Sequence, residues 1–413
     1  MSRETLHDVR HSTPHLLNPQ QLKIYPNLLR AVVDGLYETF EGRYADRVVA
    51  DLLKRDQRWG SRDRAFIAES VYEIVRWRRL LGHIAGRPEP EFLLAAYWWR
   101  RHGEALDVAG LPVLYAPDLE RGAASAKTQR AIRESIPDWL DLLGAEELGG
   151  GWPATLSALN QPAEVYLRTN TLKTTREALI SALHGEGIEA VVDDRSPEAL
   201  RITKRRNLWG TKSFRKGQYE VQDIGSQRIA HALDVAPGMT IVDACAGAGG
   251  KTLHLAALMQ NRGRLIALDT DDRKLQELKR RAKRAGLQNV EARHVTSSKV
   301  VKRLTAQADR VLLDVPCSGL GVLRRNPDAK WKLQPGFLAE VKTWQADILT
   351  RYSRMLRPDG KLVYATCSIL PSESEAQVEA FATAGGGWAE EASERLSPVD
   401  GYDGFYFARL ARA

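Results

Sequence analysis

Two of the chain's three cysteines, Cys317 and Cys367, occupy similar places in the sequence. Cys317 lies in LLDVPCSGLGVLRR, residues 312–325, and Cys367 lies in LVYATCSILP, residues 362–371; each follows an apolar run and precedes a serine. A single cysteine is usually a buried apolar residue, which is how we interpret Cys245. Two cysteines at matching positions instead indicate a shared chemical task.

A thiol pair of this kind suits methylation at carbon 5 of cytosine, which is a poor nucleophile. Addition of a thiolate to carbon 6 enables carbon 5 to attack a methyl group, and a base must then remove the carbon 5 proton. Asp314, three residues before Cys317, is placed to act as an acid near ring nitrogen 3. The pKa of a free thiol is about 8.5, so a cysteine nucleophile needs local activation.

A glycine-rich segment, VDACAGAGGKT (residues 242–252), lies between a strand pattern and a helix pattern. A phosphate-binding loop would require glycine at position 245, and a dinucleotide fingerprint starting at Gly247 would require glycine at position 252; neither is present. The small residues Ala246, Gly247 and Gly249 let the backbone approach a ligand closely. Asp269, 20 residues after Gly249, is typical of a carboxylate that accepts ribose hydroxyls. The pattern therefore indicates a nucleoside ligand without phosphate, and points to S-adenosylmethionine.

Strands and helices alternate from about residue 226 onward, which predicts an α/β fold with a doubly wound, mainly parallel sheet of the class I methyltransferase type. Ligands of such sheets bind at the carboxyl ends of the strands. Asp314 and Thr366 end the fourth and fifth predicted strands. Neighbouring strands lie about 4.8 Å apart, so the two thiols converge if these strands are neighbours. The strand patterns are residues 239–245, 264–269, 290–295, 309–315, 360–367 and 404–410, and the helix patterns are 251–260, 272–286, 336–356 and 372–384.

The remainder of the chain predicts two further parts. Residues 1–145 repeat apolar residues at helical intervals, for example over 26–40, 45–56 and 61–84, and predict a small helical bundle. Residues 146–225 predict a small α+β module, and the third part, residues 226–413, is the α/β domain.

The net charge of +8 and the pI near 9.3 favour an anionic partner. Residues 264–303 hold 12 Lys and Arg against 5 Asp and Glu, and residues 201–217 interleave seven cations with Trp209 and Phe214. Such stretches suit phosphate contact and base stacking, although a solvated surface is the simpler interpretation of either one alone. The N-terminus lacks the apolar core of a signal peptide, and no apolar run has the length of a membrane helix. With three unpaired cysteines and no zinc-type spacing, we expect a cytoplasmic monomer without a metal.

Several motifs resemble those of the RNA cytosine-5 methyltransferases of the Sun/Fmu (RsmB) and NSUN type. The resemblance rests on DACAGAGGKT, DVPCSGLGVLRRNPDAKW, YATCSILPSESEAQVEAF and DGFYFARL, with YLRTNTLK and VQDIGSQ upstream. It extends from about residue 160 to the end of the chain. The helical residues 1–145 are similar in type to the NusB-like RNA-binding domain of the bacterial members, and the α+β module would also bind RNA.

The resemblance implies specific roles. Cys367 would be the nucleophile, Cys317 would assist proton removal and release, and Asp314 would contact the cytosine. S-adenosylmethionine would be held by Cys245, Ala246, Gly247, Gly249, Lys251, Asp269, Arg273 and Asp314. RNA would be contacted by Arg324, Arg325 and Asn326. From the basic stretches, we add Lys279, Arg280, Arg281, Lys204, Arg205 and Arg206 as further expected RNA contacts. Ribosomal RNA, most of all that of the small subunit, would be the substrate, with transfer RNA and large-subunit RNA as alternatives.

One departure from the family pattern keeps another function open. After the third predicted strand the family usually has an acidic residue near the adenosine end of the cofactor, whereas residues 293–299 read RHVTSSK. A catalytically silent RNA-binding assembly factor therefore remains an alternative, although both cysteines, Asp314 and Asp269 are retained. A DNA cytosine methyltransferase typically has Pro-Cys-Gln, whereas this chain has Pro-Cys-Ser. A nucleotide hydrolase would need glycine at position 245, where this chain has cysteine. We expect target selection to rest on residues 1–225 and the basic helix.

Overall fold

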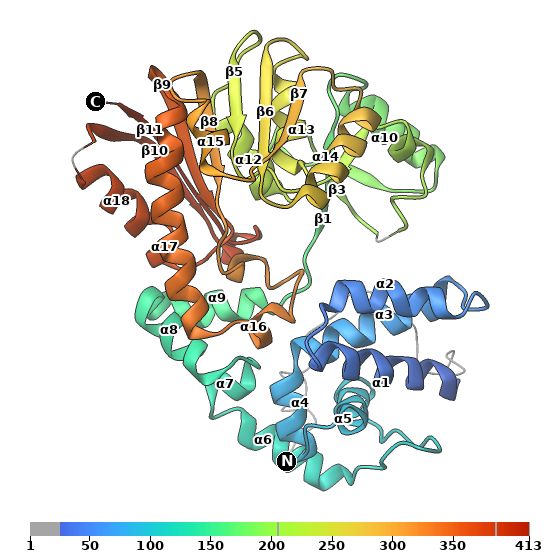
Figure 1. Cartoon of the computed structure of the whole chain (residues 1–413). Coiled ribbons are helices and arrows are strands. Elements are labelled where there is room, and N and C mark those ends of the chain that lie inside the picture. Colours follow the sequence, from blue (N-terminus) through green and yellow to red (C-terminus); the bar gives the residue numbers. More distant parts are fainter. Residues whose placement is uncertain (1–24, 205, 385, 413) are drawn as a thin grey trace. The chain divides into compact units, whose positions relative to one another are not determined.

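The computed structural model describes residues 25–204, 206–384 and 386–412, which form two compact units (Figure 1). The first unit contains the residues up to Glu146 together with Arg325–Leu333, and the second contains Glu147–Arg324 and Gln334 to the end. The chain therefore clusters into two units, and the three-part division expected from the sequence stays a prediction. No described helix has the length and apolar character needed to cross a membrane.

The first unit is helical because its apolar residues recur every three or four positions. In α1, for example, Leu28, Leu29, Val32 and Leu36 are buried together, and Pro26 occupies the first turn, where its missing N–H costs nothing. The predicted helix over residues 61–84 is wrong in one respect, because the backbone leaves helical geometry at Trp77 (φ −103°, ψ 19°) and separates two helices. The helices are α1 (Pro26–Phe40), α2 (Ala45–Arg55), α3 (Ser61–Arg76), α4 (Arg78–Ala85), α5 (Pro90–His102), α6 (Ala116–Ala126), α7 (Arg130–Arg133), α8 (Asp138–Leu148, which runs into the second unit) and α16 (Ala329–Lys332).

A short segment that follows the Cys317 motif, Arg325–Leu333, packs inside this helical unit. The Asp328 carboxylate accepts the backbone N–H of Ala45 at 3.1 Å, and the Trp331 indole donates to the carbonyl of Val75 at 2.7 Å. Lys330 is buried, and burial lowers its pKa well below the ordinary value. The segment that follows the Cys317 motif in the sequence thus contributes buried residues to the helical unit.

The second unit begins with a four-stranded antiparallel sheet in the order β2-β3-β1-β4, covered by α10 (Figure 1). Leu167, Leu200 and Tyr219 of the strands pack against Leu179 and Leu183 of the helix. We call this part the α+β module. Its elements, preceded by η3 (Gly149–Gly151) and α9 (Trp152–Leu159), are β1 (Val165–Thr169), α10 (Arg176–Gly185), β2 (Ala190–Val192), β3 (Ala199–Ile202), α11 (Lys212–Arg215) and β4 (Tyr219–Val221).

A seven-stranded sheet in the order β10-β11-β9-β8-β5-β6-β7 follows, as the alternating pattern predicted. Strands β5 to β9 pair in parallel, whereas β11 pairs antiparallel with both β9 and β10. Its strands are β5 (Thr240–Asp243), β6 (Arg264–Asp269), β7 (Val290–His294), β8 (Ala308–Asp314), β9 (Leu356–Thr366), β10 (Trp388–Leu396) and β11 (Phe405–Arg412). Its helices are α12 (Ile224–Ala232), α13 (Gly250–Leu258), α14 (Asp272–Ala285), α15 (Ser298–Lys302), η4 (Leu320–Val322), α17 (Pro335–Tyr352), η5 (Ser353–Met355), η6 (Pro371–Glu373), α18 (Glu375–Thr383) and η7 (Pro398–Asp400).

Helices cover both faces of this sheet because successive strand residues point to opposite sides. Ile241 of β5 packs against α12 and α13, and its neighbour Val242 packs in the core formed with α15, α17 and α18. Strand order reverses at β5, which has β6 on one side and β8 on the other. The carboxyl ends of these strands are therefore the expected ligand position of a doubly wound sheet.

Candidate active site

The glycine-rich segment forms the turn from β5 into α13. Gly249 has a φ of +87°, and a Cβ there would lie 2.6 Å from the Leu278 side chain, so glycine is required by the packing of α13 against α14. Gly247 also has a positive φ of +55°, but a Cβ there would meet no atom within 4 Å. Gly247 thus presents bare backbone to open space, which is the side from which a ligand can approach.

Asp269 ends β6 beside this turn. One of its carboxylate oxygens accepts the backbone N–H of Gly247 and the other accepts that of Asp271, both at 2.8 Å. The carboxylate is half-buried, and each oxygen retains a lone pair for a further donor. The exposed backbone at Gly247 and the remaining acceptor capacity of Asp269 fit the ribose of a nucleoside such as that of S-adenosylmethionine.

The other residues expected at the cofactor lie around the same turn. Ala246 is buried and its N–H is donated to the carbonyl of Leu268 at 2.8 Å. Cys245 is partly buried, and burial raises the pKa of its thiol. Arg273 is exposed in the first turn of α14, and its side chain has no described contact with the turn. The exposed His294 is the last residue of β7, and its ring contacts the Thr270 carbonyl at 2.9 Å.

The α+β module and α14 brace the glycine turn from outside. Buried Arg168 of β1 donates to the carbonyl of Gly250 at 2.6 Å, and Arg281 of α14 donates to the carbonyl of Ala248 at 2.8 Å. Arg281 also forms an ion pair at 3.0 Å with Glu220, a buried carboxylate on β4. These contacts hold the turn in place. The Arg281 guanidinium, which was expected to contact RNA, is engaged in them.

Lys251, in the first turn of α13, forms an ion pair with Asp314 at the end of β8, with Nζ and Oδ2 2.7 Å apart. Burial works against the Lys251 ammonium, but the Asp314 carboxylate outweighs this, and the pKa of Lys251 is raised above its ordinary value. Electrostatic interaction with Cys367 also contributes to this rise. A positive charge is therefore held close to Cys367, at the point where the expected cofactor and catalytic residues meet.

The two cysteine sulfurs, Cys317 Sγ and Cys367 Sγ, lie 3.2 Å apart. They meet because β8 and β9 are parallel neighbours with Asp314 opposite Ala365, so the chain leaves both strands at the same edge. Contact with the Cys367 thiol, together with burial, raises the pKa of Cys317 well above its ordinary value. The Cys317 thiol therefore resists losing its proton while Cys367 lies beside it.

The serine that follows each cysteine has a shared partner, Glu373. This fully buried carboxylate accepts the hydroxyls of Ser318 and Ser368 at 2.5 and 2.6 Å, and the backbone N–H of Ser318 at 2.8 Å. Gln345 of α17 donates a further hydrogen bond at 3.1 Å. Sequence reasoning missed Glu373, for which the only signal was its place in the family motif SESEAQ. The paired Cys-Ser motifs are therefore held together through one carboxylate.

The loops after β8 and before β11 touch at two glycines. The Gly321 N–H is donated to the Cys367 carbonyl at 2.9 Å, and the Gly321 carbonyl accepts the N–H of Gly404 at 2.8 Å. A Cβ at Gly321 would lie 1.9 Å from the Gly404 carbonyl oxygen, so a side chain cannot be accommodated without moving a loop. The backbone at Cys367 is thus set by glycine contacts.

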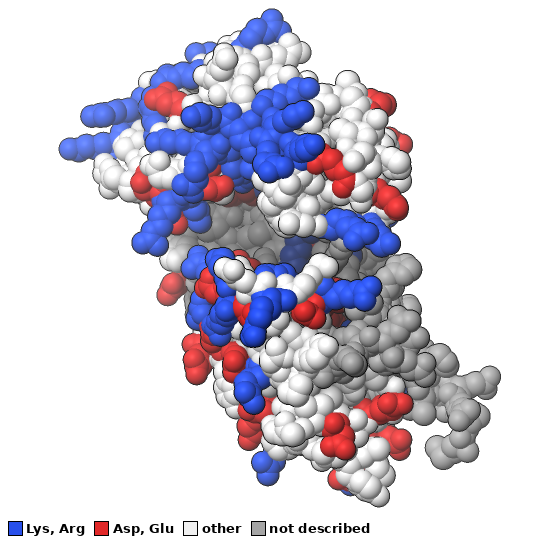
Figure 2. Space-filling view, turned by 90° about the vertical axis from the view of Figure 1, so that its right-hand side faces the viewer, with Lys and Arg blue, Asp and Glu red and all other residues white. Residues whose placement is uncertain are grey.

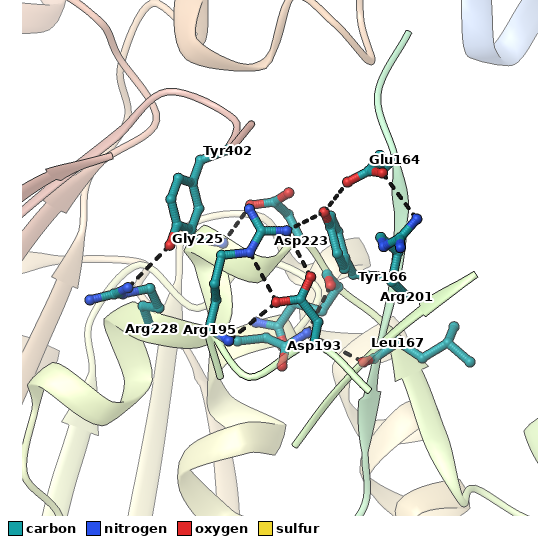
Figure 3. A network of polar contacts seen from close by, with 12 residues as sticks. Glu164, Tyr166, Leu167, Asp193, Arg195, Arg201, Asp223, Gly225, Arg228 and Tyr402 are labelled. Atoms are coloured by element: carbon teal, nitrogen blue, oxygen red, sulfur yellow. Dashed lines mark hydrogen bonds and ion pairs between the residues drawn. The ribbon is translucent and has the colours of Figure 1, made fainter. Parts of the chain in front are cut away.

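The α+β module holds the loop before β11 through an arginine and two tyrosines (Figure 3). Arg195 lies over the rings of Tyr166 and Tyr402, at 5.5 and 4.8 Å from their centroids, and donates to Tyr166 Oη at 2.6 Å. Asp193 pairs with the same guanidinium at 2.7 Å, and Arg228 donates to Tyr402 Oη at 3.2 Å. Since Gly404 follows Tyr402 closely, this network steadies a loop that contacts the cysteine region.

Three residues that follow the Cys317 motif were expected to contact RNA. The Arg324 guanidinium donates to the carbonyls of Tyr402 and Pro162, both at 3.0 Å, so it ties loops of the second unit together. Arg325 begins the segment that belongs to the helical unit, and Asn326 within that segment is exposed. That these three residues contact RNA stays a prediction.

The other residues expected at RNA lie on the surface of the second unit. Lys204, Arg206, Lys279 and Arg280 are exposed, and Arg280 pairs with Glu277 of the same helix. Arg205 lies outside the described residues. The roles of all these residues stay predictions.

One group of histidine and carboxylate side chains among the described residues is compact enough to share a cation. The Nε2 atoms of His231 and His254 lie 2.8 and 3.3 Å from Oε2 of Glu198. Burial lowers the pKa of His254 to about 3, so this ring is neutral at physiological pH. These hydrogen bonds link Glu198 of the α+β module to His231 of α12 and His254 of α13, which is a structural role for the group. That the protein works without a metal stays a prediction.

Comparison with protein families finds two matches that together span most of the second unit. A model described as 16S rRNA methyltransferase RsmB/F matches residues 230–411. A model of the ferredoxin-like domain of RsmF/B-like methyltransferases matches residues 136–208, which include much of the α+β module.

The chain is also similar to curated proteins and solved structures. It is 36% identical over 267 residues to the probable ribosomal RNA small subunit methyltransferase B of Synechocystis sp., and 34% identical over 253 residues to that of Bacillus subtilis. The matches cover 64% and 61% of this chain, but 60% and 56% of those relatives. Among structures, PH0851 gives a TM-score of 0.80 at 24% identity, covering 95% of this chain and 100% of that one. NSun6 from Pyrococcus horikoshii with SFG gives 0.63 at 22% identity, covering 68% and 99%, and both likenesses establish the fold alone.

Proposed function

The chain belongs to the RsmB/F methyltransferase family, and from this premise we propose that it methylates carbon 5 of cytosine in ribosomal RNA with S-adenosylmethionine as methyl donor. The names of the matched family and relatives favour RNA of the small subunit. The observation that carries the proposal is the 3.2 Å approach of two thiols beside the Lys251–Asp314 pair. A cytosine that reaches these groups meets a nucleophile, a second thiol and a charged pair together.

Cys367 is the nucleophile in this proposal. Its thiolate adds to carbon 6 of cytosine, and the electron pair of the 5,6 double bond becomes available at carbon 5. The Lys251 ammonium lies close enough to Cys367 to interact electrostatically with its sulfur. When bound, S-adenosylmethionine supplies an electrophilic methyl group, which carbon 5 attacks.

The ion pair changes the role that we assign to Asp314. A carboxylate paired with Lys251 is an acceptor, so it suits the exocyclic amino group of cytosine rather than proton delivery to ring nitrogen 3. The ammonium of Lys251 is the available donor for that ring nitrogen. We therefore propose that Asp314 orients the base and that Lys251 supports charge development on the ring.

Cys317 completes the reaction by removing the proton from carbon 5. Its pKa is raised in the free protein first of all by the contact with Cys367. Once Cys367 is bonded to carbon 6, that contact no longer opposes ionisation, and Cys317 can lose its proton to solvent and act as a base. Transfer of the carbon 5 proton to Cys317 then re-forms the 5,6 double bond, and Cys367 leaves as a thiolate. The two thiols thus act one after the other.

Transfer of a labelled methyl group tests this function. The full-length protein is incubated with methyl-tritiated S-adenosylmethionine and, separately, with small-subunit RNA, large-subunit RNA, transfer RNA and DNA, and the products are digested to nucleosides. We expect label in 5-methylcytidine from small-subunit RNA, and none with Cys367→Ala. Label in another nucleoside would contradict the proposal, as would a Cys367→Ala protein as active as the wild type. No transfer to any nucleic acid would favour the silent binding factor.

A further inference from the structure

Two basic stretches that lie far apart in the sequence form one surface of the second unit. The guanidinium of Arg284, near the end of α14, lies 3.8 Å from the ring centroid of Phe214 in α11. The Asn170 side chain donates to the carbonyl of Ala285 at 2.9 Å, and Lys173 Nζ donates to the carbonyl of Arg284 at 2.7 Å. The C-terminal half of α14 is therefore packed directly against the α+β module.

Part of the positive charge in this region is used inside the protein. Arg281 and Arg284 form ion pairs with the buried Glu220, and Lys173 caps backbone carbonyls. The outward-pointing cations differ, since none of them has an ion pair with a carboxylate among the residues that the structure describes. These exposed residues, which we call the basic face, are Lys212, Arg215 and Lys216 of α11 and its C-cap and Lys279 and Lys283 of α14.

Figure 2 shows Lys and Arg side chains crowded over this side of the second unit, with few acidic side chains between them. Unneutralised cations at this density attract a polyanion, and Lys and Arg contacts to phosphates are the usual source of nucleic-acid affinity. An acidic partner is therefore the expected occupant of the basic face.

Two features beside the basic face fit nucleobases. Trp209, in the loop that leads into α11, is 62% exposed, although its neighbour Leu208 is buried. A cavity of about 310 Å³ lies between α14 and β7, with Lys279 and Lys283 at its rim and an apolar lining that includes Leu287 and Val290. An exposed indole and an apolar hollow flanked by cations suit unstacked bases whose phosphates are held nearby.

The basic face consists of other residues than the cysteine site, although both adjoin the glycine turn. Arg281, which lies between Lys279 and Lys283 in α14, donates to the carbonyl of Ala248 in that turn. Lys279 and Lys283 instead line the hollow beside β7.

We propose that the basic face binds the backbone of an unpaired RNA segment that flanks the target cytosine, with bases stacked on Trp209 or seated in the adjoining hollow. The proposal rests on the proposed function for the identity of the nucleic acid. It adds a second contact region that the catalytic residues do not include. In this proposal Arg281 and Arg284 serve the packing of α14. The lysines of the basic face contact the RNA.

The salt dependence of RNA binding tests this proposal. Anisotropy of a labelled single-stranded RNA of about 16 nucleotides is measured with the full-length protein over a salt series. The variants are Lys279→Gln/Lys283→Gln, Lys212→Gln/Lys216→Gln and their combination. The control is Arg351→Gln/Arg354→Gln, which removes two exposed cations of α17 and η5, outside the basic face. Each phosphate contact contributes about 0.7 to the slope, so each lysine pair should reduce it by about 1.4 and the control should not.

Trp209→Ala separates stacking from charge. We expect affinity for the single-stranded RNA to fall about 10-fold with an unchanged salt slope, and affinity for a duplex of the same sequence to stay the same. Equal losses for both RNAs would overturn the assignment to an unpaired segment. Slopes of the lysine variants equal to the control would overturn the basic face, provided that the wild type binds and methylates RNA. A wild type that binds RNA with the expected slopes but transfers no methyl group would instead refute the proposed function alone.

Discussion

Glu373 accepts hydrogen bonds from Ser318 at 2.5 Å and from Ser368 at 2.6 Å, and thereby joins the residues that follow Cys317 and Cys367. The two serines lie 50 positions apart in the chain, and their hydroxyls are 3.2 Å apart. The carboxylate is fully buried, so both loops must be in place for its oxygens to be satisfied. This contact couples the geometry of one thiol to that of the other.

Glu373→Gln should slow methyl transfer about 10-fold or more. The amide nitrogen of the new side chain replaces one carboxylate oxygen, and it would face a hydroxyl or N–H donor of Ser318 or Ser368 that this oxygen accepts. If Glu373 positions the thiols, kcat should fall while KM for S-adenosylmethionine stays the same. The conservative Glu373→Asp keeps both acceptors and should recover part of the rate. Unchanged kcat in Glu373→Gln would show that the thiols are positioned without it.

Gly321→Ala should disturb the backbone at Cys367, because the added methyl group would overlap the Gly404 carbonyl oxygen at 1.9 Å. Overpacking of this kind costs about 1 to 3 kcal/mol in the free energy of unfolding. We expect urea unfolding to shift accordingly and the methyl-transfer rate to fall. Gly336→Ala, in the first turn of α17 with no atom near its Cβ, is the control and should change neither quantity. Equal behaviour of the two variants would contradict the account of the loop contact.

Asp269→Ala should weaken binding of S-adenosylhomocysteine, measured by calorimetry, by about 10- to 100-fold, since hydrogen bonds to a carboxylate contribute about 1.5 to 3 kcal/mol. The variant loses the acceptor for the Gly247 N–H as well as the ribose partner. Asp271→Ala removes the same charge two residues away, at the N-cap of α14, and should affect affinity much less. An Asp269→Ala protein with wild-type affinity would remove the ribose assignment.

Much of the site could be predicted because its signals are local. The alternation of strands and helices located the sheet, and the cysteines lie at strand ends that the register of β8 and β9 brings together. Strand β10 was not predicted, because its sequence WAEEASERL is polar and most of its residues are exposed at the sheet edge. An edge strand of this kind lacks the apolar alternation on which strand prediction depends.

Other features depend on contacts between distant residues, which sequence patterns do not reveal. The segment Arg325–Leu333 reads as a basic turn, but it packs in the helical unit through Asp328, Lys330 and Trp331. Arg281 reads as a surface cation, but it pairs with Glu220 from a different sheet. The role of Glu373 follows from two serines that only the folded chain brings together.

Asp243→Asn should change how stability depends on pH. Asp243 is fully buried with one carboxylate oxygen unpartnered, and burial raises its pKa to about 7 despite the hydrogen bond from Thr252. The folded protein therefore binds more protons than the unfolded chain between about pH 4 and pH 7, so the contribution of Asp243 to stability is lost as the pH rises through that window. From pH 5 to pH 7 the wild type should lose about 2 to 3 kcal/mol relative to Asp243→Asn, measured by urea unfolding. Parallel pH profiles for the two proteins would contradict the raised pKa.

A denaturing gel tests the division of labour between the thiols most directly. Wild type, Cys317→Ala and Cys367→Ala are incubated with S-adenosylmethionine and small-subunit RNA, and a protein–RNA band that survives denaturation is sought. Cys317→Ala should form the band, because Cys367 can attack carbon 6 but the carbon 5 proton is not removed, and Cys367→Ala should form none. A band with Cys367→Ala and none with Cys317→Ala would contradict the account and reverse the two roles.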